Sequence, residues 1–281
     1  MIISNLIKQG SEILKKQNII SHQIDAELLL SMTIEKDRAF LFTNDESKVS
    51  QKKTYDYLNF ILRRKKYEPL SYITKKKEFW SLNFKVNHNV LIPRPETEII
   101  VEQVVRKFKN KSHLNILDIG TGSGCILLSI LNELKNSHGI GIDKSSKALN
   151  IAKKNSRKLN LSQRAKFIHC CVDNFNFGNY DVVVSNPPYI CSNGIKHLRE
   201  DIKGFEPRIA LDGGSNGLGV INKVILKAKK LLKTGGCLFL EIGDGQSHMV
   251  SNILIKSGFN LVKEIFDYKK TIRCIISTKR Y

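Results

Sequence analysis

The chain has 281 residues, of which 41% are hydrophobic and 26% charged, and this composition is typical of a globular protein rather than a disordered one. The length suffices for one large domain and one small domain. No apolar run approaches the roughly 20 residues that a membrane-spanning helix needs. Lys and Arg number 46 against 26 Asp and Glu, so the formal net charge is +20. Such a charge fits either a transient contact with RNA or the ribosome, or a lysine-rich composition spread over solvated faces.

The cysteines and the start of the chain bear on the compartment. The six cysteines are scattered and form no CxxC pair, which argues against a zinc site or a disulfide framework and favours a reducing environment. The first residues, MIISNLIKQG, lack the basic segment and apolar stretch of a secretory signal. We therefore expect a soluble cytoplasmic protein that binds no metal ion and does not enter a membrane.

Residues 1–75 have helical periodicity and few strand signals. The stretch SHQIDAELLLSMTI begins with a potential N-cap, Ser21, and continues as a leucine-rich stripe. A second stretch, TYDYLNFILRRKK, has apolar residues at three- and four-residue spacing and ends before Pro69. These patterns predict a small all-helical domain.

The rest of the chain predicts a different architecture. Residues 76–97 alternate apolar and polar side chains and predict a β-hairpin linker. In residues 98–281 strand patterns alternate with helix patterns, which predicts an α/β domain with a mostly parallel sheet covered on both faces. The last two strands are joined only by Lys269 to Thr271, a link too short for a crossover, so one strand is expected to be antiparallel.

A glycine-rich segment, LDIGTGSGC, follows one predicted strand and opens a helix. Gly120, Gly122 and Gly124 allow a sharp turn and a close approach to a ligand. The spacing is GxGxG rather than the GxGxxG of dinucleotide-binding loops, and the GK[ST] ending of a phosphate-binding loop is absent. The segment is either a nucleoside-binding loop or a tight strand–helix turn.

Acidic residues near this loop favour the first interpretation. Asp143 ends the next strand, about 20 residues after the loop, where a carboxylate can bind the ribose hydroxyls. Nothing in the pattern requires a pyrophosphate, which favours S-adenosylmethionine as the cofactor, with Asp118 placed to orient its ammonium group. Asn174 follows the strand after that, where either the adenine edge or an ordinary polar loop is expected.

The stretch SNPPYI follows a buried strand and predicts a rigid corner. Two prolines cannot continue a central strand. A planar NH2 group is a poor nucleophile, and two acceptors on its N–H bonds orient it toward an electrophilic methyl carbon. Asn186 can supply one acceptor through its side-chain oxygen and Pro187 the other through its carbonyl, while Tyr189 offers a flat face. The alternative is a plain strand-terminating turn.

Taken together, several motifs make the chain resemble the PrmC/HemK family of N5-glutamine methyltransferases, which act on peptide chain release factors. These motifs are DAELLL, PLSYI, EFWSLNFKV, VLIPRPETE, LDIGTGSGC, SNPPYI, FEPRIALDGG and GGCLFLEIG, and they cover nearly the whole length. NPPY alone is shared with DNA and RNA amino-methyltransferases, whereas its combination with IPRPETE and FEP is more specific.

The resemblance implies a seven-stranded class I S-adenosylmethionine-dependent methyltransferase sheet behind an N-terminal helical domain that recognises the substrate. The implied substrate is the glutamine of the GGQ loop in release factors 1 and 2, and we expect a monomer. The resemblance implies substrate and catalytic contacts at Asn186, Pro187, Pro188 and Tyr189. It implies cofactor contacts at Gly120, Thr121, Gly122, Ser123, Gly124, Asp143, Asn174 and Asn186.

The chain departs from the family pattern at three positions. Ser81 and Lys75 stand where the family commonly has glycine, so we expect a slightly different hairpin. Asn174 stands where an aromatic or apolar residue near the adenine is frequent. Just before the core lie Arg94, Glu96 and Glu98, which are either a helix start with acids in its first turn or a wall of the substrate pocket.

Two other functions stay open from the sequence alone. NPPY and the positive charge also suit a methyltransferase acting on exocyclic amines of RNA or DNA, although no sizeable DNA-recognition domain follows the motif. A catalytically silent scaffold is the other alternative, against which the glycine loop, Asp143 and Asn186 argue.

Overall fold

The computed structural model describes residues 1–111 and 113–280. The chain divides into two compact units: Met1–Lys75 with Arg199–Phe205, and Lys76–Leu198 with the chain from Glu206 onward. The assignment of the hairpin as a linker and of the helical unit to substrate recognition stays a prediction. Within the described residues, every helix is too short or too polar to traverse a lipid bilayer.

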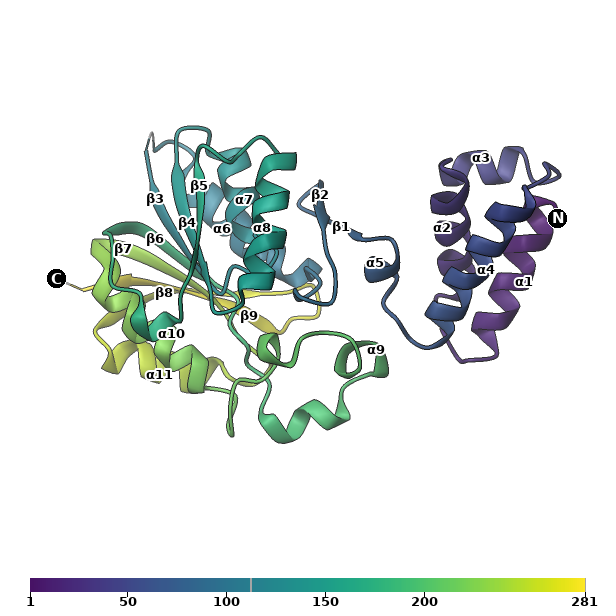
Figure 1. Ribbon diagram of the computed structural model, residues 1–281. Helices are drawn as coiled ribbons and strands as arrows, with labels where there is room; N and C mark the ends of the chain where they lie inside the picture. The colour runs from purple at the N-terminus through teal and green to yellow at the C-terminus, as the bar shows by residue number, and fades with distance from the viewer. Residues whose placement is uncertain (112, 281) are drawn as a thin grey trace. The chain divides into compact units, whose positions relative to one another are not determined.

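The first unit is helical, as its periodicity predicts. Helices α1, α2 and α4 contact one another pairwise around an apolar core (Figure 1). Tyr57 lies fully buried there, and its hydroxyl donates a 3.1 Å hydrogen bond to the carbonyl of Leu6. The helices are α1 (Ile3–Lys15), α2 (His22–Ile34), α3 (Arg38–Thr43), α4 (Gln51–Lys65), α5 (Leu70–Ile73) and α9 (Glu200–Lys203).

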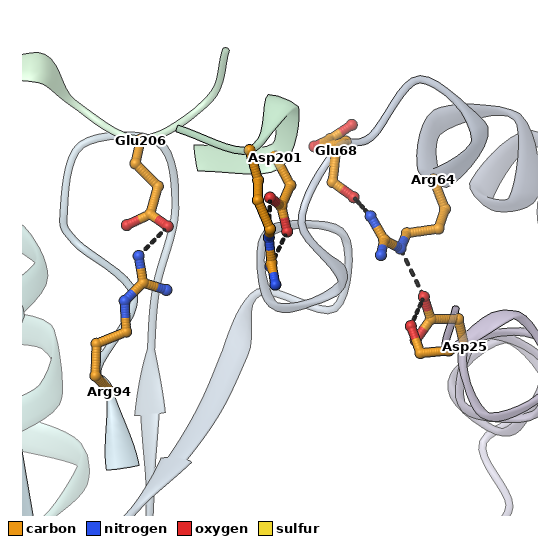
Figure 2. A network of polar contacts seen from close by, with 8 residues as sticks. Asp25, Arg64, Glu68, Arg94, Asp201 and Glu206 are labelled. Carbon is orange, nitrogen blue, oxygen red and sulfur yellow. Dashed lines mark hydrogen bonds and ion pairs between the residues drawn. The ribbon is translucent and has the colours of Figure 1, made fainter. Parts of the chain in front are cut away.

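One ion pair crosses the interior of this unit. Figure 2 shows Arg64 of α4 donating to Asp25 of α2 at 2.7 Å, while its other end reaches the backbone carbonyl of Glu68. Ser21 precedes α2 as predicted, but it does not cap the helix, because its ψ of 19° lies outside the extended region that a capping residue adopts. Its hydroxyl instead donates to Asp25.

The second unit contains a seven-stranded sheet in the order β5-β4-β3-β6-β7-β9-β8. All neighbouring pairs are parallel except those made by β9, which runs antiparallel between β7 and β8. The predicted mostly parallel sheet with one antiparallel strand is therefore confirmed. The strands are β3 (Asn115–Ile119), β4 (His138–Asp143), β5 (Ala165–His169), β6 (Tyr180–Ser185), β7 (Leu232–Glu241), β8 (Phe259–Phe266) and β9 (Ile272–Lys279).

Two apolar layers sandwich this sheet. Successive side chains of a strand point to opposite faces, so Val182 and Val184 pack with Phe239 in one layer and Val183 packs with Leu238 in the other. Helices α6, α7 and α8 cover the first face, and α10 and α11 cover the second (Figure 1). Their bounds are α6 (Glu98–Phe108), α7 (Cys125–Glu133), α8 (Ser146–Lys158), α10 (Gly219–Leu231) and α11 (Ser247–Lys256).

The predicted hairpin forms from β1 (Lys76–Phe79) and β2 (Leu82–Lys85), which pair antiparallel. Its two-residue turn places Trp80 at φ 51° and Ser81 at φ 55°. Positive φ at both central residues is what a type I′ turn requires, and glycine adopts it at the lowest cost. Lys75, the other position where the resembled family has glycine, has φ 58°. Both departures thus place a side chain on left-handed backbone.

Candidate active site

A cavity of about 300 Å³ lies at the C-terminal ends of β3 and β6. These strands are neighbours in the sheet, but the chain passes through β4 and β5 on one side before it returns to β6. Ligands of open α/β sheets bind in the crevice at such a switch point. The hydroxyl of Ser185 donates a 2.7 Å hydrogen bond to the carbonyl of Ile119, which ties the two strand ends together beneath the cavity.

The glycine loop forms one wall of the cavity. Gly120 and Gly122 have φ of 76° and 54°, and a Cβ atom on either would meet almost nothing, so these residues expose bare backbone. The backbone N–H of Gly122 donates to Asp143 at 2.9 Å, and the N–H of Ser145 donates to the other oxygen at 2.8 Å. Each carboxylate oxygen keeps a lone pair for a hydroxyl ligand. Burial raises the pKa of Asp143, and the two N–H groups oppose that rise.

Asp118 lies at the end of β3, fully buried below the loop. Its Oδ2 accepts a 2.6 Å hydrogen bond from the Thr121 hydroxyl, whereas its Oδ1 is buried without a hydrogen-bond partner among the described residues. Burial raises the pKa of Asp118 to about 7. A cationic group nearby would lower the cost of ionising this carboxyl.

The NPPY corner forms the facing wall. The side-chain nitrogen of Asn186 donates a 3.0 Å hydrogen bond to the hydroxyl of Thr97, a buried residue that ends the short helix η1 (Pro95–Thr97). Within the described part of the chain, the side-chain oxygen of Asn186 and the carbonyl of Pro187 accept no hydrogen bond. Two acceptors on a rigid corner therefore remain available to a donor in the cavity.

Tyr189 holds the NPPY corner on the side that packs against the core. Its hydroxyl lies 3.5 Å from Oε1 of Glu241, the last residue of β7, and its carbonyl accepts a 3.0 Å hydrogen bond from Gln246. Burial and the Glu241 carboxylate raise the pKa of Tyr189. The ring packs with the core layer under α10 and α11, so its phenol stays neutral and holds the backbone of the corner.

An ion pair supports a third wall of the cavity. Figure 2 shows Arg94 donating to the buried carboxylate of Glu206 at 2.5 Å. The other oxygen of Glu206 accepts a 3.2 Å hydrogen bond from the backbone N–H of Ile92. Arg94 and Pro207, the residue after Glu206, both line the cavity. One carboxylate thus joins two loops that lie more than 100 positions apart in the sequence.

Comparisons with known proteins identify the family. Residues 110–276 match the family model described as a methyltransferase domain, and residues 5–74 match the PrmC N-terminal domain. A release factor glutamine methyltransferase of Clostridium acetobutylicum is 37% identical, and one of Clostridium botulinum is 38% identical. The first alignment covers 99% of each chain and the second covers all of both. The chain belongs to the release factor glutamine methyltransferase family.

A solved structure agrees with this family at the level of the fold. A methyltransferase from Pyrococcus furiosus superposes with a TM-score of 0.54 over 73% of this chain and 92% of that one, at 19% sequence identity. The chain therefore has a class I methyltransferase fold, as the sequence predicts.

The cavity brings together most of the site residues that the sequence predicts for a release factor glutamine methyltransferase. Three predicted residues do not line it. Gly124 instead caps α7 and packs near Leu128 and Ala152, Asn174 lies beyond Asp173 in the adjoining loop, and Tyr189 lies behind the corner. The ligand contacts of all the predicted site residues stay predictions. The predicted residues that line the cavity are Gly120, Thr121, Gly122, Ser123, Asp143, Asn186, Pro187 and Pro188.

Four residues that shape this site have no assigned role in the sequence interpretation. Thr97, Glu206, Glu241 and Gln246 each bond to a residue far away in the sequence. Glu241 carries the clearest signal, because a carboxylate at the end of the apolar strand LFLE is exceptional in a buried position. Gln246 belongs to GDGQ, interpreted as a turn, and its side chain binds the corner.

Proposed function

We propose that this chain transfers a methyl group from S-adenosylmethionine to the side-chain amide nitrogen of the GGQ glutamine in peptide chain release factors. The observation that carries the proposal is the Asn186–Thr97 hydrogen bond. It engages one N–H of the Asn186 amide and leaves the side-chain oxygen as an acceptor, beside the Pro187 carbonyl in a cavity that the glycine loop also lines. Family membership supports the same reaction.

The residues in and around the glycine loop fit S-adenosylmethionine, which supplies a methyl group already activated on a sulfonium. Asp143 keeps free lone pairs for the ribose hydroxyls, and the bare backbone at Gly120 and Gly122 allows a ligand to approach closely. The buried, unpartnered Oδ1 of Asp118 suits a cationic neighbour such as an ammonium group.

The corner residues orient the nucleophile. An amide NH2 that donates one N–H to Asn186 and the other to Pro187 is held with its nitrogen lone-pair direction fixed. The nitrogen becomes acidic only as its new bond to carbon forms, so the proton can leave to water without a strong base. The prolines keep both acceptors in place before the substrate arrives, which lowers the reorganisation that the reaction requires.

We further propose that release factors 1 and 2 are the substrates, and that the chain acts as a cytoplasmic monomer. All six cysteines are unpaired thiols, which supports a reducing compartment. The two acceptors of the corner match the two N–H bonds of a glutamine amide, and the similarity to release factor glutamine methyltransferases supports a protein side chain as the substrate.

We also propose a transient contact with RNA through the exposed face of α8. No carboxylate lies in this helix, and none of its exposed cations forms an ion pair among the described residues. Reversing the charge of two of them should abolish weak, salt-dependent RNA retention while methylation of free release factor stays unchanged. The cations are Lys147, Lys153, Lys154, Arg157 and Lys158.

The decisive experiment uses isotopically labelled S-adenosylmethionine with a release factor, rRNA, tRNA and duplex DNA in parallel. We expect label on the release factor alone, with mass spectrometry placing it on the GGQ glutamine. A release factor with alanine in place of that glutamine, and the Asn186→Ala enzyme, serve as controls. Label on a nucleic acid but not on the release factor would establish the alternative amine methyltransferase.

A further inference from the structure

The backbone of the NPPY corner packs directly against buried glycines. A Cβ atom on Gly217 would lie 2.3 Å from the carbonyl oxygen of Tyr189, and one on Gly213 would lie 2.7 Å from that of Pro188. A Cβ atom on Gly243 would lie 3.0 Å from the Tyr189 ring. Side-chain carbons almost never approach another atom within 3.0 Å. The two carbonyls of the corner therefore leave no room for a side chain at Gly213 or Gly217.

Backbone hydrogen bonds hold the segment 211–214 against the chain that follows the corner. The N–H of Ile190 donates to the carbonyl of Leu211 at 3.1 Å, and the N–H of Gly213 donates back to the carbonyl of Ile190 at 2.8 Å. The N–H of Ser192 then donates to the carbonyl of Gly214 at 2.9 Å. Because of this ladder, the segment cannot move away from the corner without breaking hydrogen bonds.

Gln246 holds the Tyr189 carbonyl from a third segment. Its side chain is buried, its Oε1 accepts a 2.9 Å hydrogen bond from the N–H of Gly243, and its Nε2 donates a 3.0 Å hydrogen bond to the Tyr189 carbonyl. One partner can only donate and the other can only accept, so the amide has a single satisfactory orientation. The carbonyl that Gly217 contacts is thus also the one that Gln246 binds.

These contacts bear on the acceptor at Pro187. Its carbonyl belongs to the peptide group that joins it to Pro188, and the carbonyls of Pro188 and Tyr189 belong to the next two peptide groups. The ring of Pro188 already fixes its φ, so the contact at its carbonyl fixes the remaining rotation. We propose that Gln246, Gly213 and Gly217 are positioning residues that set the direction of the Pro187 carbonyl through the NPPY backbone. The inference rests on the proposed function.

Gly217→Ala is the sharpest perturbation, and the chain offers a matched control for it. Gly217 and Gly235 both have φ of 73°, so alanine bears the same left-handed strain at either position. Gly235 is exposed at the start of β7, outside the cavity, and a Cβ atom there would meet no described atom within 4 Å. The two variants therefore differ in the contact with the Tyr189 carbonyl and the Gln246 amide.

Two variants of Gln246 separate its two hydrogen bonds. Gln246→Glu keeps the acceptor for the N–H of Gly243 but places an oxygen against the Tyr189 carbonyl, whereas Gln246→Met removes both bonds at nearly the same length. Gly213→Ala tests the Pro188 carbonyl without added strain, because Gly213 is not among the residues with positive φ. Measurements for every variant are kcat and KM with release factor, the dissociation constant of S-adenosylmethionine by calorimetry, and the thermal unfolding temperature.

We expect Gly217→Ala and both Gln246 variants to lower kcat by about 10- to 100-fold, because a misplacement of about 1 Å in an orienting group can cost about 100-fold in rate. Affinity for S-adenosylmethionine should change by less than about threefold, since the glycine loop extends from a different strand. Gly235→Ala should keep kcat within about twofold of the wild type, even where its unfolding temperature falls as far as that of Gly217→Ala.

Other outcomes separate the two proposals. If the wild type methylates release factor and Gly217→Ala is as active as Gly235→Ala, the inference is wrong and the proposed function stands. A loss in Gln246→Met without one in Gln246→Glu would also overturn it, because Gln246 would then hold only its own turn. If the wild type leaves release factor unlabelled, the proposed function fails and takes the inference with it. Should Gly217→Ala not fold, Gly213→Ala and the two Gln246 variants decide.

Discussion

The backbone N–H of Gly122 donates a 2.9 Å hydrogen bond to a carboxylate oxygen of Asp143. Asp143 therefore lines the cavity and also holds the glycine loop in place. Its second carboxylate oxygen accepts a hydrogen bond from the N–H of Ser145. Cofactor binding and loop geometry depend on the same side chain.

Replacing Asp143 should weaken cofactor binding more than it slows turnover. In Asp143→Ala the loop loses its anchor and the ribose loses its acceptor, so KM for S-adenosylmethionine should rise by more than kcat falls. Asp143→Asn should not restore cofactor binding, because its NH2 group is a donor and would lie against the N–H of Gly122 or Ser145, which is also a donor. Steady-state kinetics and calorimetry measure this, and an unchanged KM would remove the assignment.

Asn186→Ala should act mainly on the rate of methyl transfer. Removal of one polar group from a preorganised site raises the barrier by roughly 2.7–4 kcal/mol, or about 100- to 1000-fold in kcat. Affinity for S-adenosylmethionine should fall much less. Single-turnover rates with release factor provide the measurement, and near-normal turnover would show that the corner does not hold the nucleophile.

Glu206→Gln should destabilise the loops that wall the cavity. The carboxylate accepts hydrogen bonds from Arg94 and from the N–H of Ile92. A glutamine would place its NH2 group against one of these two donors, and that hydrogen bond would be lost. Loss of a hydrogen bond to a charged group costs roughly 1.5–3 kcal/mol. Urea denaturation should show a lower midpoint. Glu102→Gln, a change on the exposed side of α6, is the control and should leave the midpoint unchanged.

Ser81→Gly should stabilise the protein. Left-handed backbone costs an L-residue roughly 1–2 kcal/mol, and glycine avoids this cost but loses more entropy on folding. The net gain should be roughly 0.5–1 kcal/mol in the free energy of unfolding. Ser81→Ala keeps the side chain on the same backbone and should show no gain. A glycine variant no more stable than the alanine variant would contradict the assigned turn.

The stability of the wild type should depend on pH through Glu241. Burial raises its pKa from the ordinary 4.5 to about 7, while Thr97 and Arg273 pull it down and Glu96 pushes it up. The folded protein therefore binds a proton that the unfolded chain releases, and its stabilising effect is complete below about pH 4.5 and lost as the pH rises through about 7.

Glu241→Gln isolates this contribution. The glutamine has no proton to lose, so the free energy of unfolding of the variant minus that of the wild type should grow between about pH 4.5 and 7. Urea denaturation at a series of pH values measures the difference. A difference that is constant with pH would mean that the carboxyl titrates normally in the folded protein.

The parts of this structure that the sequence could predict are those with a local cause. Strand and helix patterns follow from the spacing of apolar residues. The antiparallel β9 follows from the short link after β8, which the sequence predicts as three residues and the structure has as five, 267–271. The glycine loop and the NPPY corner are also local, because each is a short segment whose backbone restrictions are visible in the residues themselves. Ser21 shows the limit, since its type suits a cap but its backbone angle does not.

The contacts that complete the site could not be predicted from spacing, because they join distant segments. Thr97 meets Asn186 across 89 positions, and Arg94 meets Glu206 across 112. The position of Tyr189 behind the corner depends on Glu241 and Gln246, which come from the end of another strand and the start of another helix. Such pairs are fixed only when the sheet order is known.

The hydrogen-bonded pairing of β3 with β6 has one more consequence for catalysis. The glycine loop and the NPPY corner extend from adjacent strands, whose separation of about 4.8 Å is set by the backbone ladder rather than by any side chain. The residues proposed to bind the methyl donor and those proposed to bind the methyl acceptor thus extend from paired strands of one sheet, with no hinge between them. Changes in surface loops can alter which molecule enters without changing the distance over which the methyl group must travel.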